Sequence, residues 1–176
     1  MDLDPMTLRE CTLEDAQTLS LIGAATFLEV FAGILEGASI VAHCQNQHAP
    51  DVYRKYLAQP GARAWLAVVP PGDAPVGYVL LTAPDLPLAD LTEADIELKR
   101  IYLFSRFQGN GRGQALMSCA LEAARLMGKT RVLLGVHAEN AKALAFYRKC
   151  GFVQVGVRTF QIGATQYHDL VLGRSL

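Results

Sequence analysis

The chain has 176 residues, 51% of them hydrophobic, which is enough for a single domain with a buried core. Its net charge of −1 and its pI near 6.4 give no electrostatic reason to expect binding to nucleic acid or to an anionic membrane surface. No apolar run reaches the roughly 20 residues of a membrane helix, and the four cysteines are scattered rather than grouped in a motif. We therefore expect one domain over residues 1–176, without a secretory signal, in the cytoplasm with free thiols.

The first sixty residues predict one short strand and a helical layer. Met6–Cys11 has the pattern of a strand, and Thr12 starts a helix with Asp15 as the capping partner three residues later. Ile40–Ala58 is less regular but also helical, with an interruption near Pro50.

The next segment predicts a hairpin. Arg63–Val69 and Val76–Thr82 read as two strands, and the residues between them are rich in proline and glycine, so the pair is antiparallel. Ala83–Ala94, with two prolines and several acids, reads as a loop.

A change of phase marks the strand predicted over Asp95–Leu103. Ile96 and Leu98 occupy even positions, whereas Ile101 and Leu103 occupy odd ones. Because side chains alternate strictly along a strand, one apolar face requires an extra residue near Lys99-Arg100, which is a β-bulge. A strand buried on both faces would show the same pattern.

The second half alternates strands and helices. This order makes part of the sheet parallel and predicts an α/β fold, with a mixed sheet of about six to seven strands and about four flanking helices. The expected elements are a helix over Asn110–Met127, a strand over Thr130–Val136, a helix from Asn140 that ends at Lys149-Cys150-Gly151-Phe152, and strands over Val153–Ile162 and Gln166–Leu172.

The glycine-rich segment Gln108–Gly113 lies between the bulged strand and a long amphipathic helix. Amides at a helix N-terminus, together with the helix dipole, favour a pyrophosphate group. The segment lacks the Gly-Lys-Ser/Thr of a Walker loop, and Gln114 stands where a dinucleotide fingerprint has its third glycine. What remains is Gln-x-x-Gly-x-Gly.

A second motif, Asn140-x-x-Ala143-x-x-x-Tyr147, follows about thirty residues later. With both motifs in this order, the sequence resembles the GNAT superfamily of N-acetyltransferases, which implies a GNAT-like fold and acetyl-CoA as the acetyl donor. The resemblance implies that Gln108, Gly109, Asn110, Gly111, Arg112 and Gly113 hold the pyrophosphate. It also implies that the backbones of Ile101 and Leu103 pair with the pantetheine arm and that the Leu103 amide polarises the thioester carbonyl.

The resemblance assigns Asn140 to the pantetheine and Tyr147 to the sulfur. Seven residues separate them, so both lie on one helix face about 10 Å apart along the axis. Tyr147 would return a proton to the departing thiolate. The alternative is that Tyr147 is an aromatic residue of the core without a catalytic role.

A catalytic base is required because an alkyl amine with a pKa near 10.4 is only about one part in 10³ neutral at pH 7. Glu97, in the bulged strand and on the face opposite Ile96 and Leu98, is the first choice. An ion pair with Lys99 is the alternative. The acids Asp85, Asp90, Glu93 and Asp95 are either solvated or part of a mouth that attracts an amine.

The resemblance extends to the bacterial polyamine (spermidine/spermine) N-acetyltransferase branch. It rests on Glu97–Leu103, on Leu134-Gly135-Val136, and on Phe160–Gly163 with Asp169. One departure is His137-Ala138, where that branch tends to carry a tryptophan and an acid.

The sequence therefore predicts transfer of an acetyl group from acetyl-CoA to a primary amine, in a ternary complex, with a small polyamine-like acceptor. Two alternatives stay open: transfer to an N-terminal or lysine amine of a peptide, and a CoA-binding regulatory module without turnover. We expect no metal, because Cys44 and His48 have no convincing third ligand. The terminal strands offer an edge for a homodimer.

Overall fold

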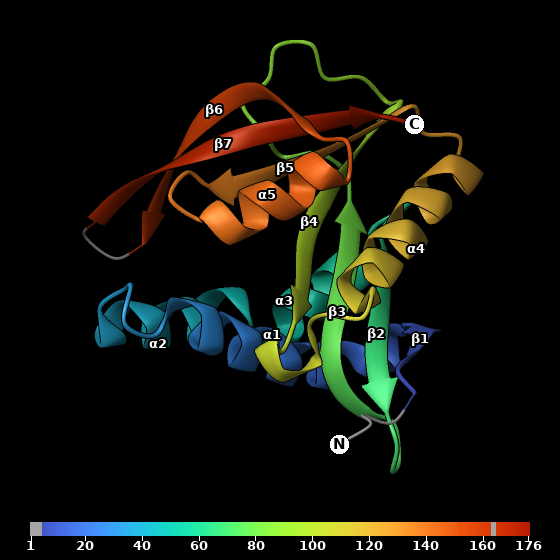
Figure 1. Cartoon of the computed structure of the whole chain (residues 1–176), viewed down its shortest axis with the longest axis vertical. Coiled ribbons are helices and arrows are strands. Elements are labelled where there is room, and N and C mark those ends of the chain that lie inside the picture. The colour runs from blue at the N-terminus through green and yellow to red at the C-terminus, as the bar shows by residue number, and fades with distance from the viewer. Residues whose placement is uncertain (1–4, 163–164) are drawn as a thin grey trace.

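The computed structural model describes residues 5–162 and 165–176, which form one mixed sheet of seven strands in the order β1-β2-β3-β4-β5-β7-β6 (Figure 1). Gly163, part of one motif above, lies outside the described residues. The strands are β1 (Thr7–Glu10), β2 (Arg63–Val69), β3 (Ala74–Thr82), β4 (Asp95–Leu103), β5 (Arg131–His137), β6 (Val153–Ile162) and β7 (Thr165–Ser175). The α-helices are α1 (Ala16–Phe31), α2 (Gly37–Gln47), α3 (Pro50–Leu57), α4 (Arg112–Leu126) and α5 (Ala141–Lys149).

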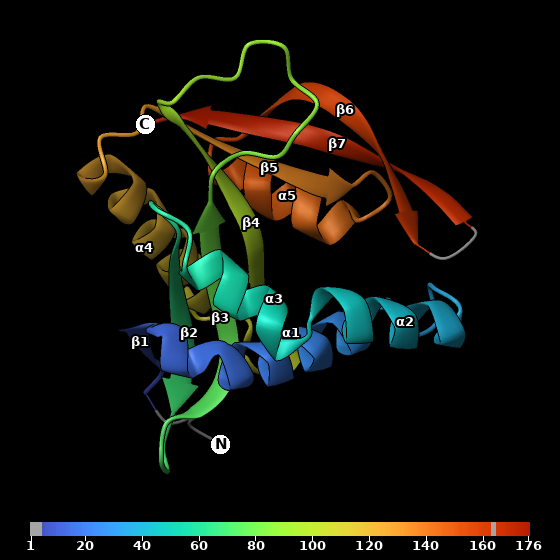
Figure 2. The same cartoon turned by 180° about the vertical axis from the view of Figure 1, so that it is seen from behind.

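Helices cover both faces of the sheet. Leu19 of α1 and Tyr53 of α3 pack on Leu66 and Leu80 of the sheet, while α4 packs on the opposite face through Leu116 and its neighbours. Helix α5 shares the core of α4, so α4 and α5 stand in front of the sheet in Figure 1 and behind it in Figure 2. No described helix combines the length and the apolar character that a membrane crossing requires.

The predicted bulge is present in β4. Leu80 of β3 pairs with Arg100 while Leu81 pairs with Leu98, so Lys99 is the extra residue. As a result Ile96, Leu98, Ile101 and Leu103 all join the core beneath α4. The first half of the strand, from Asp95 to Leu98, is also buried on both faces.

Beyond the first three residues of β4, the sheet splits. Asp95–Glu97 pair in parallel with Arg131–Leu133 of β5, and in the described chain the rest of β4 pairs with β3 alone. Strand β5 continues along β7, and Figure 1 shows it turning away from β4. The split leaves one edge of the second half of β4 without a partner strand.

Several local sequence signals are confirmed. Thr12 and Asp15 form a complete capping box, although the first turn is a 3-10 helix (Leu13–Asp15) before α1 begins. Pro50 interrupts the helical region by starting α3, where its missing N–H costs nothing. The interrupted region begins earlier than predicted, because α2 starts at Gly37.

Candidate active site

The free edge of β4 presents backbone groups from two predicted site residues. The Phe104 amide donates to the Val76 carbonyl of β3 at 2.9 Å, which fixes the phase of the antiparallel pairing. Hydrogen-bonded and non-hydrogen-bonded pairs alternate along such a ladder. The backbone groups of Ile101 and Leu103 therefore point away from β3, toward the side from which β5 has separated.

Gln108 ties the glycine turn to its neighbours. Its side-chain Nε2 donates to the Leu103 carbonyl at 2.8 Å, and Lys142 of α5 donates to its Oε1 at 2.5 Å. The side chain thus braces β4, the turn and α5 against one another. Because the Leu103 carbonyl is already engaged, the N–H is the group that Leu103 presents at the edge.

The turn after Gln108 has a backbone that few residues adopt. Gly109, Asn110 and Gly111 all have positive φ, at 93°, 48° and 76°, a region that favours glycine and tolerates asparagine. Helix α4 starts directly afterwards, and its first i−4 bond runs from the Ala115 amide to the Gly111 carbonyl. Of the preceding amides, that of Arg112 donates to the Gly109 carbonyl at 3.1 Å, and the others belong to the set that suits an anion.

Gly113 lies where α4 faces α5. A Cβ built at Gly113 would lie 3.6 Å from the ring of Phe146. Arg112, the first residue of α4, has a buried Nη1 atom that bonds to no described protein group. The six residues Gln108–Gly113 therefore form one compact corner between β4, α4 and α5.

Helix α5 holds the other two predicted residues. The Asn140 side chain accepts a hydrogen bond from the Ala143 amide at 3.1 Å, so it caps the helix as expected. At the other end, the Phe152 amide donates to the Tyr147 carbonyl and the Gly151 amide to the Arg148 carbonyl, which is the predicted Schellman arrangement.

The Tyr147 ring is fixed by this helix end. It lies between the rings of Phe146 and Phe152, with centroid distances of 5.6 and 5.9 Å. Burial, and to a lesser degree the neighbouring Tyr102 phenol on β4, raises the pKa of Tyr147. The phenol is therefore protonated at neutral pH and available as a hydrogen-bond donor.

Glu97 is buried and has two partners. Its side chain is 2% exposed, and its Oε2 accepts from the Asp85 amide at 2.8 Å. The Lys99 ammonium lies 3.3 Å from its Oε1. The predicted ion pair thus exists, and it holds the carboxylate on the face of β4 that also carries Arg100 and Tyr102.

The structure also places a chain of tyrosine hydroxyl groups on this face, and the sequence did not predict these tyrosines as site residues. The Tyr53 hydroxyl donates to that of Tyr78 at 3.1 Å and lies 2.8 Å from His48 Nδ1. The Tyr78 ring stacks on Tyr102, with centroids 5.9 Å apart. The alternation of β4 after the bulge was the available signal, since it puts Arg100 and Tyr102 on the Glu97 face.

Two of the acids expected at an amine-attracting mouth bind an arginine instead. Asp95 is buried and binds Arg131 through both oxygens, at 2.7 and 2.9 Å. Asp90 binds the same guanidinium at 2.8 Å. For Asp95 this corrects the expectation of a mouth or of a solvated acid, because it is buried against an arginine, whereas Asp90 is exposed to solvent as expected and shares that arginine.

Cys44 and His48 also have other partners. Cys44 donates through sulfur to the Ala24 carbonyl at 3.8 Å, while His48 bonds to Tyr53. Over the described residues, no three His, Cys, Asp or Glu side chains are grouped in a way that could hold a metal ion.

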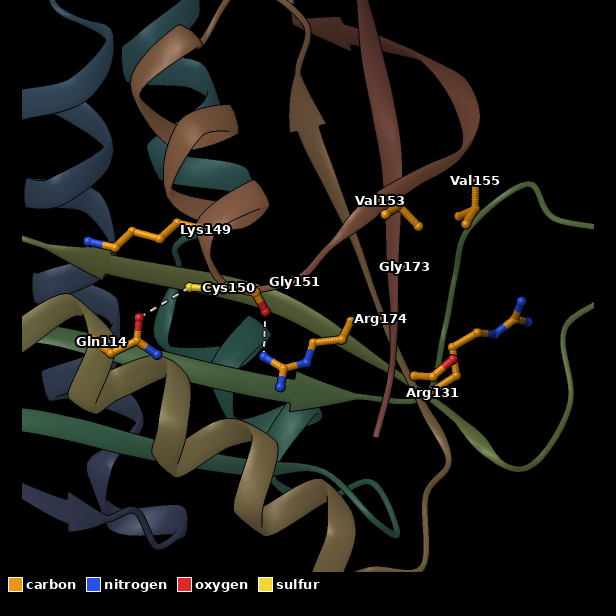
Figure 3. A pocket seen from close by; sticks show the side chains of 10 residues that line it. Gln114, Arg131, Lys149, Cys150, Gly151, Val153, Val155, Gly173 and Arg174 are labelled. Carbon is orange, nitrogen blue, oxygen red and sulfur yellow. Dashed lines mark hydrogen bonds between the residues drawn. The ribbon is translucent and has the colours of Figure 1, made fainter.

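A hollow of about 690 Å³ lies behind the end of α5, away from the free edge of β4 (Figure 3). Figure 3 shows Cys150 directed at Gln114, with its thiol 3.5 Å from the Gln114 oxygen, and Arg174 bound to the Cys150 carbonyl. Burial raises the pKa of the Cys150 thiol. A protonated, bonded thiol is a poor nucleophile, so these contacts anchor the helix end.

Known proteins share both the sequence and the fold. The sequence pattern of the acetyltransferase (GNAT) family matches residues 28–152. The chain belongs to this family. An uncharacterized N-acetyltransferase of Mycobacterium tuberculosis is 33% identical over 164 residues, which are 93% of this chain and 99% of that protein.

Solved GNAT structures have the same architecture. The PaiA N-acetyltransferase from Thermoplasma acidophilum, in complex with coenzyme A, superposes with a TM-score of 0.74 at 17% identity, covering 98% of this chain and 99% of that one. Family, relatives and fold agree that the protein is an N-acetyltransferase of the GNAT type, which uses acetyl-CoA as acetyl donor.

Proposed function

We propose that this protein transfers the acetyl group of acetyl-CoA to the primary amine of a small molecule, with the donor bound along the free edge of β4. One observation carries the proposal. The sheet splits after Glu97, and the split opens beside a turn of three positive-φ residues that leads into α4. Backbone donors and a helix end would thus be available to the arm and the pyrophosphate of one long ligand.

The donor contacts follow from this geometry. The turn Gly109–Gly111 and the first amides of α4, including Gly113, would hold the pyrophosphate. The outward backbone of Ile101 and the Leu103 N–H would meet the pantetheine and the thioester carbonyl. Arg112 and Gln108 would support these contacts, Arg112 through its charge and Gln108 by holding the turn in place.

Acetyl-CoA supplies a thioester carbon at which the C–N bond forms as the C–S bond breaks, with the amine proton lost and a thiolate released. The amine must arrive neutral, which costs roughly 4 kcal/mol at pH 7 for an ordinary alkyl ammonium. Glu97 would accept the proton directly or through water, since it is the acid held on the acceptor face of β4 next to the bulge.

Tyr147 would stabilise the thiolate that leaves as the C–S bond breaks. Its protonated phenol, fixed beside Phe152, can donate a hydrogen bond to a thiolate whose conjugate acid has a pKa near 8.5. Because burial raises the Tyr147 pKa, stabilisation by this hydrogen bond is the larger part of its role. Holding amine and thioester together contributes more than either acid–base step.

The acceptor is the open part of the proposal. The sequence resemblance suggests a polyamine, and a peptide amine is the alternative. Names among the similar proteins point to a small amino acid and to a protein amine: an N-acetylaspartate synthetase of Xenopus tropicalis is 30% identical over 69% of this chain, and an Escherichia coli ribosomal-protein-S18-alanine N-acetyltransferase has a TM-score of 0.65.

A screen of amines separates these acceptors and tests the proposal itself. Thiol release from acetyl-CoA is followed with polyamines, amino acids, arylalkylamines and short peptides, and products are verified by mass. We expect acetylation of at least one small amine. Tight CoA binding without product from any acceptor would instead favour a regulatory module.

A further inference from the structure

Arg100 carries a positive charge that no described carboxylate balances. Its guanidinium carbon lies 5.0 Å from the Tyr53 ring centroid and 5.6 Å from that of Tyr56, and Nη2 donates to the Gln47 carbonyl at 2.8 Å. Nη1 is buried and makes no hydrogen bond to a described residue. The ion pairs of the described chain do not include this guanidinium.

The groups around Arg100 are neutral. Burial, with the charge of Arg100 as the next cause, lowers the pKa of His43 to about 4 and that of His48 to about 2. Burial raises the pKa of the Tyr53 and Tyr78 phenols. A partly buried cation surrounded by neutral groups is costly, so a counter-charge from outside the protein would be stabilised beside it.

Other interior charges of this protein are treated differently. Asp95 and Glu97 are each matched by a cation, and Asp169 binds Arg158 at 3.0 Å. The acids near the split are thus already neutralised, while a cation on the same face is not. This imbalance disfavours an acceptor with several ammonium groups and favours one with an anionic group.

The position of Arg100 places its charge on the α1–α3 face of β4, which is the side left for the acceptor. It follows the bulged Lys99 and precedes Ile101, whose backbone faces the split. Arg100 and Tyr102 point toward the α1–α3 layer, whereas Ile101 and Leu103 join the core of α4 and α5. A donor held on the α4 and α5 side leaves the Arg100 side for the amine.

From these contacts we infer that the acceptor carries a carboxylate and that Arg100 binds it, which makes an amino acid or a similar acid-bearing amine the substrate class. The inference rests on the proposed acetyl transfer. The guanidinium would place the anion with charge-assisted hydrogen bonds. Tyr53 is fully buried, so it would hold the guanidinium in position rather than contact the acceptor. The amine nitrogen would then lie near Glu97.

Matched pairs of acceptors test the inference. Each L-amino acid is compared with its own carboxamide, which keeps the shape and the amine but removes the negative charge, and spermidine is included. For the best pair we expect kcat/KM to favour the acid about ten- to a hundredfold in the wild type. In Arg100→Gln this ratio should fall to near one, and in Arg100→Lys it should be intermediate.

Arg54→Gln is the matched control. Arg54 lies on α3 beside Tyr53 but is exposed and pairs with Asp51. The control loses the same charge and should keep the wild-type ratio. Thermal unfolding of all variants shows whether each is folded. If Arg100→Gln is unfolded, the acid-to-carboxamide ratios of kcat/KM in the wild type and in Arg100→Lys decide.

The outcomes are distinct. Spermidine as the best acceptor, or equal acid-to-carboxamide ratios in wild type and Arg100→Gln, would overturn the inference and leave acetyl transfer intact. No product from any amine would overturn the proposed function. In that case calorimetry of the wild type with CoA and the amino acids would still decide, since binding that Arg100→Gln abolishes would support the anion site and no binding would reject it.

Discussion

The two sides of the split sheet offer different kinds of groups to the ligands proposed for them. On the α4 and α5 side, the predicted donor contacts are mostly backbone groups, set by three positive-φ residues and by the outward edge of β4. On the α1–α3 side, the proposed contact is the Arg100 side chain, which lies over the buried Tyr53 ring, and Tyr53 in turn bonds to the buried His48. The first kind of site requires particular residues only where φ is positive, whereas the second depends on the side chain of one residue.

This difference explains why acetyl-CoA use is easier to infer than the acceptor. Backbone sites leave a sequence trace, because only glycine or asparagine fits the required φ angles. A side-chain site leaves no such trace, since an arginine is common on any surface. Four substitutions test this difference between the two sides.

The largest effect is expected from Glu97→Gln, on the boundary between the two sides. The amide can still accept the Asp85 N–H bond but cannot take the amine proton, so kcat should fall about 10²- to 10⁴-fold at pH 7. Steady-state kinetics with the best acceptor measures this. Glu93→Gln, an exposed residue of the same region, is the control. Retained kcat with a lowered unfolding temperature would assign Glu97 a structural role.

Tyr147→Phe tests the donor side. It removes the phenol oxygen and leaves the ring packing on Phe152, so kcat should drop at least tenfold while CoA affinity stays within about twofold. Turnover and calorimetric CoA binding are measured on the same preparation. Unchanged turnover would remove the phenol from the reaction.

Gly111→Ala tests whether the turn acts through its backbone. A Cβ at this position meets no atom within 4 Å, so the cost is strain at φ +76°, about 1–2 kcal/mol. We expect KM for acetyl-CoA to rise roughly three- to thirtyfold if that strain displaces the amides. Gly37→Ala in α2 has equal space without a positive φ and is the control. Equal KM values in the two variants would argue against the turn as the pyrophosphate site.

The smallest effect is expected from Asn140→Ala. Losing the cap of α5 should cost about 1 kcal/mol of unfolding free energy, or about 2–4 °C in Tm. The exposed Asn46→Ala within α2 should not destabilise the protein. If KM for acetyl-CoA also rises at a temperature where the variant is fully folded, the result would support the pantetheine contact. An unchanged KM would leave Asn140 with the role of a helix cap alone.

Much of the fold was predictable because its signals are local. The phase change in β4 predicted the bulge at Lys99, and Gly151-Phe152 predicted the end of α5. The Arg100 network was not predictable, because Tyr53, Tyr78 and Gln47 come from three elements that only the tertiary fold brings together. The pairing of Asp95 with Arg131 was missed for the same reason.

The most direct test of the account is a crystal structure of the protein with CoA bound. We predict pyrophosphate oxygens within hydrogen-bonding distance of the amides of Gly109–Gly113, and the sulfur between the Leu103 N–H and the Tyr147 hydroxyl. CoA bound in the hollow behind Cys150, or anywhere away from the turn before α4, would contradict the assignment of both sides of the sheet.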